Sequence, residues 1–345
     1  MMQKYSFLLK SPSPDGNGIL FWFLPFFLAR TKKDIVDSGK KLQKKEKFGF
    51  KFYFCKKNMI QYNPKDWLTF IFRIHRSDTF RKLFPLMVTI GIYSGIVCFI
   101  ELEYYKLNEK SLIKNLSMMH SLLGFVISLL LAYRTNTAYD RWWEGRKLWG
   151  SLVNSSRNLA LKLSAILEDE KDKKYFRKMI PLFASILNKH LNNNETSTEL
   201  YDEVLLELQK YKHQPNQAAK MMFHKINDLY KAQKITGNQL IIINTEMQTF
   251  VDVCGACERI KNTPIPYSYS SFIKKFIFIY VMTLPFGYAL SLGFTTIPVV
   301  IFIFYVLASL ELIAEEIEDP FDGDENDLPT KKLADNIRKH VEELL

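Results

Sequence analysis

Three bulky side chains lie four residues apart in an apolar stretch: Phe125, Leu129 and Tyr133. The stretch, residues 117–133, contains no Asp, Glu, Lys, Arg or Pro. On a helix with 3.6 residues per turn and a rise of 1.5 Å per residue, these positions form one stripe about 12 Å long. Where such stripes surround an axis, they form an apolar constriction that blocks ions by excluding water. The alternative is that the stripe packs against neighbouring membrane helices.

A second candidate site follows the last apolar stretch and is rich in carboxylates. Four of them occur within the segment 322–327, interrupted by one glycine and one asparagine: Asp322, Asp324, Glu325 and Asp327. Calcium takes six to eight oxygen ligands, so this acidic turn is a possible ion-binding site. The alternative is a solvated acidic turn. We expect neither a metal nor a cofactor, with calcium at this turn as the one exception.

Other reactive residue types give weaker patterns. Cys254 and Cys257 form a C-x-x-C pair, but a redox role needs a βαβ setting and a zinc site needs two further ligands. We therefore expect both thiols to be packed in a core. Arg141 and Glu144 are three residues apart, which predicts a local ion pair on a helix. Nothing in the sequence pairs a nucleophile with a base, so we do not expect an enzyme.

The elements that position these residues are membrane helices. A bilayer core needs about 20 apolar residues of helix. The hydrophobic pattern predicts four spans, with a break between Gly287 and Pro298 in the last apolar block: residues 83–102, 117–134, 268–289 and 294–313. Residues 135–267, together with 314–345, are polar and show helical spacing without the alternation of strands. The fold class is therefore an all-α membrane protein with four transmembrane helices and a large cytoplasmic helical region.

The positive charge is concentrated at the start of the chain. The net charge is +11, but residues 1–58 hold 13 Lys and Arg against 4 Asp and Glu, so the remainder has a net charge of only +2. This balance argues against nucleic acid as a partner. We interpret residues 1–58 as a basic, disordered extension or as a start-site artefact, with Met59 as the alternative start. Basic residues beside the predicted spans place both termini in the cytoplasm of a multi-pass inner-membrane protein.

Four motifs carry a resemblance to a known family. They are Arg134–Gly150 (RTNTAYDRWWEGRKLWG), Gly255–Ile260 followed by Thr263–Pro266, Thr283–Gly287 and Glu315–Phe321. Over residues 59–345, the chain resembles the bacterial branch of the bestrophin chloride channels. The resemblance implies a homopentamer in the lipid bilayer, four spans per subunit and passive flow of ions through a central pore. Eukaryotic members conduct chloride and are opened by calcium, with a run of carboxylates where this chain has its acidic turn.

The resemblance also implies roles for particular residues. Phe125, Leu129 and Tyr133 match the apolar neck of the pore, where the tyrosine is a departure that would make the inner ring more polar. A second, cytoplasmic constriction matches Ile235 or Leu240. The sequence therefore predicts a passive channel for chloride or other monovalent anions. A cation-selective channel of the same fold, a secondary transporter and a membrane-anchored scaffold are the alternatives.

Overall fold

The computed structural model describes residues 78–105, 116–192, 203–324 and 326–345. The chain divides into two units, Met1–Cys55 and Lys56–Leu345, and all described residues belong to the second. The predicted extension, residues 1–58, and Met59 lie outside the described residues. Across the described part of the chain, the secondary structure is helical and contains no strand, as predicted.

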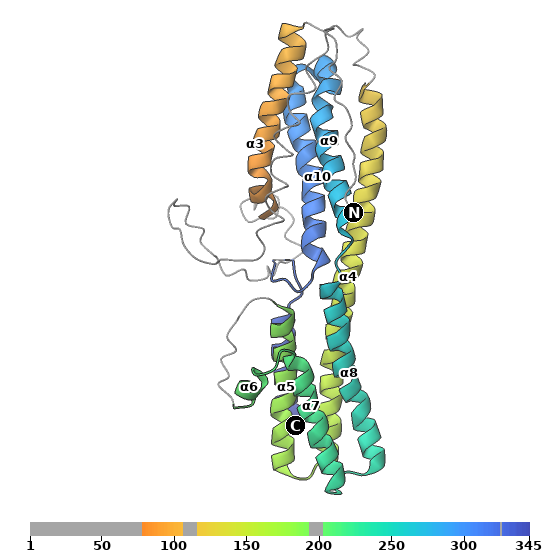
Figure 1. Cartoon of the computed structure of the whole chain (residues 1–345), viewed down its shortest axis with the longest axis vertical. Coiled ribbons are helices and arrows are strands. Elements are labelled where there is room, and N and C mark those ends of the chain that lie inside the picture. Colours follow the sequence, from red (N-terminus) through yellow and green to blue (C-terminus); the bar gives the residue numbers. More distant parts are fainter. Residues whose placement is uncertain (1–77, 106–115, 193–202, 325) are drawn as a thin grey trace, which may run out of the picture. The chain divides into compact units, whose positions relative to one another are not determined.

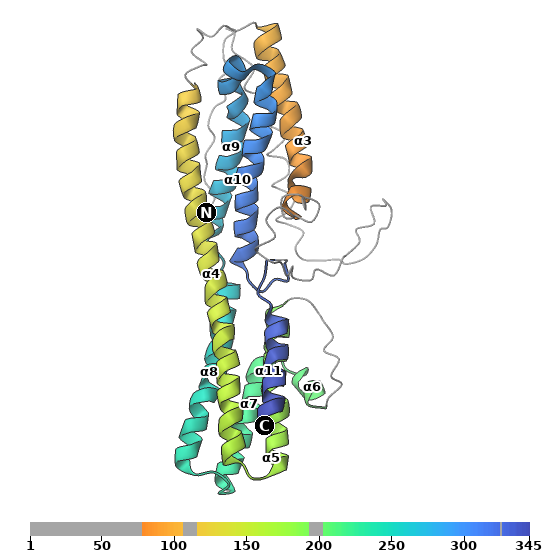
Figure 2. The same cartoon turned by 180° about the vertical axis from the view of Figure 1, so that it is seen from behind.

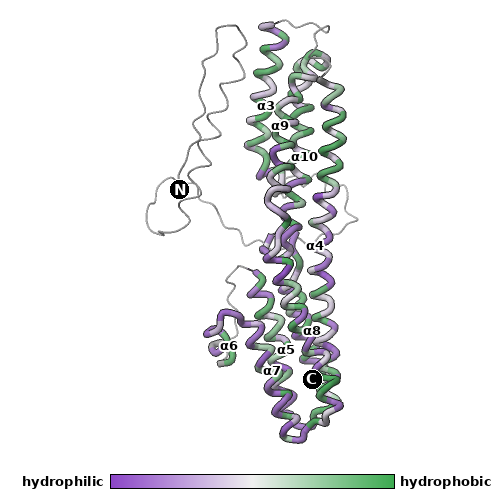
Figure 3. The backbone as a smooth tube through the Cα atoms, turned by 45° about the vertical axis from the view of Figure 1, so that its right-hand side comes forward, coloured by the Kyte–Doolittle hydropathy of each residue, from purple (hydrophilic) through white to green (hydrophobic). Residues whose placement is uncertain are grey.

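The helices that are apolar enough to cross a membrane lie together in one bundle. Its members are α3 (Asp78–Phe99, continued by the π-helix η2, Ile100–Tyr104), the first half of α4 (Leu116–Ile166), α9 (Tyr267–Leu292) and α10 (Thr296–Glu318). Helix α10 contacts α3, α4 and α9 (Figures 1 and 2). Hydrophobic residues dominate these helices in Figure 3. Helix α3 and the first half of α4 precede the polar part of the chain, whereas α9 and α10 follow α8 and return the chain to the apolar bundle.

Helices α9 and α10 are joined by a tight reversal. Together they form one apolar candidate span of 52 residues, Tyr267–Glu318. The short 3-10 helix η4 (Gly293–Thr295) separates them, and Gly293 has φ +59°. This left-handed conformation is open to glycine at little cost, so the chain can leave one helix and start the next. The break that the sequence predicts between Gly287 and Pro298 is confirmed at this point.

A second, more polar bundle is built around the second half of α4. Its other members are α5 (Glu170–Leu191), α7 (Gln214–Lys231), α8 (Gly237–Asn262) and α11 (Thr330–Leu344), with the short α6 (Glu203–Leu208) beside α7. Their buried apolar faces share one core that includes Trp149, Phe183 and Phe250. Amphipathic helices of this kind bury one face and leave a charged face to water.

Local sequence signals fix where these helices begin. The Asp169 carboxylate accepts a hydrogen bond from the amide of Lys171 and caps α5. Helix α8 begins with a capping box, in which Thr236 and Gln239 each bond to the other's backbone amide. Such caps satisfy the free amides of a first turn. Helix α4 contains no proline over its 51 residues, so it passes from the apolar bundle to the polar bundle without interruption.

Candidate functional site: the open face of helix α4

The predicted neck residues lie on a face of α4 that no other part of the described chain covers. The exposed fractions of Phe125, Leu129 and Tyr133 are 68%, 47% and 60%. On the opposite face, Ile127 and Leu131 are buried against α9 and α10. A single chain therefore holds one side of α4 firmly and leaves the other side, with its bulky apolar side chains, open.

The same open face becomes more polar as α4 continues beyond Tyr133. In the apolar bundle it also carries Met118 and Leu122, which are 81% and 67% exposed. Beyond Tyr133 its exposed side chains become mostly polar, spaced three, four or seven residues apart: Asn136, Asp140, Lys147, Ser151, Asn154 and Asn158. Side chains of this kind bind water, whereas Phe125 and Leu129 do not, and Tyr133 offers only its hydroxyl. One helix thus presents a short water-repelling section followed by a long wettable section.

A buried arginine holds α4 at the boundary between these sections. Arg134 is 1% exposed, and its guanidinium lies 2.6 Å from Glu318 and 3.6 Å from Glu311. The other Glu318 oxygen accepts a hydrogen bond from the amide of Ile265 at 2.5 Å. A buried charge is tolerated only when it is paired and hydrogen-bonded. These contacts join α4 to the end of α10 and to the linker before α9.

A second arginine, about two turns further on along the same face of α4, binds carbonyl groups rather than carboxylates. Arg141 donates to the carbonyl oxygens of Ile260 and Thr263, each at 2.6 Å, and to that of Glu318 at 2.9 Å. The last carbonyls of α8 carry the negative end of the helix dipole, which attracts a guanidinium. The predicted ion pair between Arg141 and Glu144 is therefore wrong, and Glu144 binds Arg259 at 2.5 Å instead.

Sequence reasoning did not find this pair of arginine-centred contacts. The available signal was a charged residue at the end of an apolar helix, because such a residue needs a partner at the same depth. Its partners are 177 and 184 residues away along the chain, so spacing gives no hint of them. Gly145 allows a close approach: a Cβ there would lie 3.0 Å from Leu328 and 3.1 Å from Phe321, so a larger residue would require these side chains to shift.

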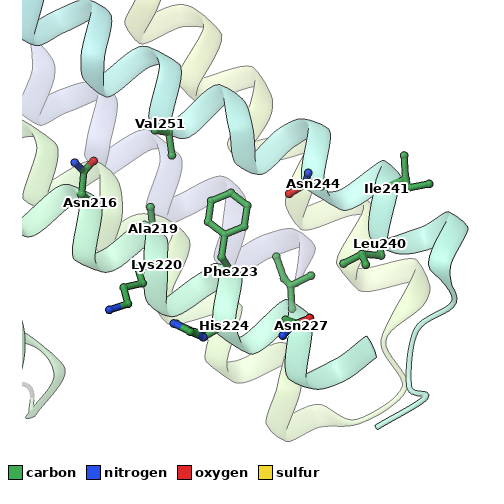
Figure 4. A pocket seen from close by; sticks show the side chains of 11 residues that line it. Asn216, Ala219, Lys220, Phe223, His224, Asn227, Leu240, Ile241, Asn244 and Val251 are labelled. Atoms are coloured by element: carbon green, nitrogen blue, oxygen red, sulfur yellow. The ribbon is translucent and has the colours of Figure 1, made fainter. Parts of the chain in front are cut away.

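The two candidates for a cytoplasmic constriction lie in different surroundings. Ile235, between α7 and α8, is 3% exposed and belongs to the core of the polar bundle. Leu240 is partly buried and lines a groove of about 700 Å³ between α7 and α8 (Figure 4). Its neighbour Ile241 lines the same groove and is 67% exposed. Ile241 and the partly exposed Leu240 are therefore accessible to another surface, whereas Ile235 is not.

The acidic turn divides into a structural and an exposed part. Asp327 is buried, and its carboxylate accepts hydrogen bonds from the amides of Gly323 and Asp324, the latter at 2.8 Å. Burial raises the pKa of Asp327 to about 7, despite these hydrogen bonds. Asp322 and Asp324 instead line a hollow together with Lys82 and Glu316. Glu325 lies outside the described residues.

The C-x-x-C pair is packed in the polar bundle as predicted. Cys254 and Cys257 are 1% and 0% exposed and form no disulfide. Burial raises the pKa of each thiol to about 12. Both thiols are therefore protonated at neutral pH and act as small apolar side chains.

Comparison with known proteins gives a consistent result. The family model described as "Bacterial/Fungal Bestrophin protein" matches residues 58–343. A voltage-dependent anion channel-forming protein of Nostoc sp. is 35% identical over 230 residues, which are 64% of this chain and 75% of the relative. A protein of the same description from Escherichia coli K12 is 29% identical over 283 residues, covering 81% of this chain and 91% of the relative.

Solved structures show the same fold. A bacterial bestrophin homologue from Klebsiella pneumoniae superposes with a TM-score of 0.69 at 24% identity. The match covers 76% of this chain and 98% of the homologue. The arrangement of helices around α4 is therefore shared with that protein over nearly its whole length.

Proposed function

This chain belongs to the bacterial and fungal bestrophin family, and we propose that it is a passive anion channel whose pore is lined by α4. Relatives in two bacterial groups are described as voltage-dependent anion channel-forming proteins. None of these descriptions is that of an enzyme, which supports a role in transport. The ion conducted is chloride or another monovalent anion, and its flow is driven by the electrochemical gradient alone.

The open face of α4 is the observation that carries this proposal. Phe125, Leu129 and Tyr133 present a section where water is unstable in a narrow space, and such a section closes a pore without a plug. The polar residues beyond Tyr133 keep the rest of the path hydrated. Phenylalanine ring edges carry partial positive charge, which favours weakly hydrated anions in the neck.

An enclosed path needs several copies of the chain, because one copy leaves this face uncovered. We propose a homopentamer in which five α4 helices surround the axis. The groove between α7 and α8, with Leu240 and Ile241, offers an apolar surface for contact between subunits (Figure 4). In native mass spectrometry, the assembly should have five times the chain mass of 40.5 kDa, and any other whole multiple would contradict the pentamer.

We propose four crossings of the membrane, and the helix order supports this number. Three candidate spans are apolar and long enough, and the third contains both α9 and α10, which reverse at Gly293 and pack on one another. Basic residues gather at one end of these helices: Arg134, Arg141, Arg146, Lys147, Lys274 and Lys275. By the positive-inside rule, this end faces the cytoplasm of a bacterial inner membrane, and so do both termini.

Recordings from planar bilayers with asymmetric KCl test the proposed selectivity. The full-length protein is reconstituted, and the voltage at which the current is zero is measured while one side holds tenfold more KCl. An anion channel gives a reversal potential close to the chloride equilibrium potential. A value close to the potassium equilibrium potential, or a saturable current that depends on a proton or sodium gradient, would contradict the proposal.

A further inference from the structure

Two histidines and a glutamate from three different helical segments converge on one point in the polar bundle. His190 is in the last turn of α5, His213 is the N-cap of α7 and Glu258 lies in α8. The Nε2 atoms of His190 and His213 lie 2.6 Å and 2.7 Å from the same carboxylate oxygen of Glu258. Among the residues that the structure describes, this is the one group whose three potential ligand atoms lie within 4.8 Å of one another.

The donor set suits a borderline-soft divalent ion. Two imidazole nitrogens and one carboxylate oxygen, with water in a fourth position, are a common ligand set for Zn²⁺. With metal–ligand bonds of about 2.0–2.1 Å, tetrahedral ligands stand roughly 3.3 Å apart. Each imidazole nitrogen therefore needs to move away from the Glu258 oxygen by less than about 1 Å to admit the ion. Each of them is between 26% and 35% exposed, so a hydrated ion has access to the point of convergence.

The positions of the two rings also favour a shared ligand. The ring centroids of His190 and His213 are 4.9 Å apart, with an interplanar angle of 38°. Protonation of both rings at this distance would place two positive charges side by side. A metal ion instead uses both Nε2 lone pairs while the rings remain neutral, and Glu258 supplies one negative charge.

Metal binding would change one local hydrogen bond. The Nδ1 atom of His213 accepts from the amide of Asn216 at 3.3 Å, so the proton of the neutral ring is on Nε2 and points to Glu258. A neutral imidazole carries one proton, and coordination through Nε2 moves that proton to Nδ1. The long bond to Asn216 is then lost while a metal–nitrogen bond is gained, and the ring releases no net proton.

We propose that His190, His213 and Glu258 form a Zn²⁺ site that links the end of α5 to the start of α7 and to α8. The site is separate from the pore face of α4 and does not depend on the proposed function. Cys254 lies one turn from Glu258 on the same face of α8 and is buried. Its thiol is not among the ligand atoms that converge at this point, so water rather than Cys254 occupies the fourth position.

The experiment uses the full-length protein in detergent, stripped of metal with EDTA and then freed of the chelator. Zn²⁺ affinity is measured by competition with a fluorescent zinc indicator, and Co²⁺ absorption reports the geometry of the bound ion. We expect one Zn²⁺ per chain and the visible bands of four-coordinate Co²⁺. In the amide exchange profile, Zn²⁺ should increase the exchange of the Asn216 amide, because that amide loses its acceptor.

Three variants separate this site from incidental binding. His213→Asn keeps an N-cap side chain but removes the imidazole, and Glu258→Gln removes the charge with little change in shape. Each should weaken Zn²⁺ binding at least tenfold, with an unchanged elution volume and circular dichroism spectrum. The matched control is His224→Asn, which removes an exposed histidine from α7 and should leave the affinity unchanged. If His213→Asn and Glu258→Gln both fold and bind Zn²⁺ as tightly as the parent chain, the site does not exist.

Discussion

A buried carboxylate in the turn after α10 shows how one residue can serve structure rather than ion binding. Asp327 is 6% exposed and accepts two backbone amides of its own turn. Its geometry is that of a turn closed by a side chain, in which the acceptor satisfies amides that would otherwise lack partners. Asp322 is exposed and does not accept the backbone amides of this turn, so its carboxylate remains accessible to a cation.

The raised pKa of Asp327 predicts a pH-dependent stability. The folded-state pKa of about 7 lies above the ordinary value for an aspartate, so the folded protein keeps a proton that the unfolded chain has lost. The stabilisation is complete below the ordinary pKa and is lost as the pH rises through about 7. Asp327→Asn retains an acceptor oxygen and cannot ionise. Its unfolding temperature should exceed that of the parent chain by about 2–4 °C at pH 8 and by less at pH 5.

The control for this measurement is Asp322→Asn, which removes an exposed carboxylate from the same turn. It should change the unfolding temperature equally at both pH values. If Asp327→Asn shows the same difference from the parent chain at pH 5 and pH 8, Asp327 does not ionise between them in the folded protein.

At the scale of single elements, the contacts of α4 with the ends of α8 and α10 depend on two arginines. Arg134 pairs with Glu318 and Glu311, and Arg141 binds the final carbonyls of α8. These contacts fix α4 in rotation as well as in position, because they engage its covered face about two turns apart. The open face with Phe125 therefore points in one direction only.

Loss of the Arg134 charge should be costly. Arg134→Gln leaves the buried Glu311 and the partly buried Glu318 without their counter-charge, and removal of one partner of a buried pair costs about 3–5 kcal/mol. We expect a clear fall in the unfolding temperature of the detergent-solubilised protein, partly recovered in Arg134→Lys. Lys82→Gln is the matched control, because the pair of Lys82 with Glu316 is 39% exposed on the lysine side and contributes at most about 1 kcal/mol. Equal effects of the two glutamine variants would show that the Arg134 pair is not buried in the protein.

Element positions were largely predictable from the sequence, whereas their contacts were not. The apolar blocks predict α3, α4, α9 and α10, and the absence of proline predicts that α4 is continuous, because hydrophobic length and backbone chemistry act locally. The partners of Arg134, Arg141 and His190 lie from 68 to 184 residues away, where periodicity carries no information. The prediction for Arg141 failed for this reason: a neighbour three residues away was visible, and the carbonyls of a distant helix end were not.

At the scale of the whole molecule, the proposed pore requires several copies of the chain, because no described residue of a single chain covers the open face of α4. The family resemblance implied the pentamer, whereas the hydrophobic pattern alone favoured packing against other membrane helices. The proposed neck therefore needs a test in the assembled channel.

Smaller side chains in the neck should hold the channel open. In the double variant Phe125→Ala with Leu129→Ala, the constriction becomes wider and water fills it more easily, so single-channel recordings should show an open probability at least about twice that of the parent. The matched control is Phe302→Ala on α10, because Phe302 is 65% exposed and Phe125 is 68% exposed. Phe302 lies outside the proposed pore, so its loss should leave gating unchanged. Altered gating in the control, or parental gating in the double variant, would remove α4 from the pore.

The unbroken course of α4 has a mechanical consequence. Its 51 residues correspond to a rod about 76 Å long, anchored near its middle by Arg134 and Arg141. The rod is also packed on α9 and α10 in the apolar bundle and on α8 and α11 in the polar bundle, so its two halves stay in line. The Ile166 end and the Phe125 section are therefore coupled through one continuous run of backbone hydrogen bonds, with no loop between them.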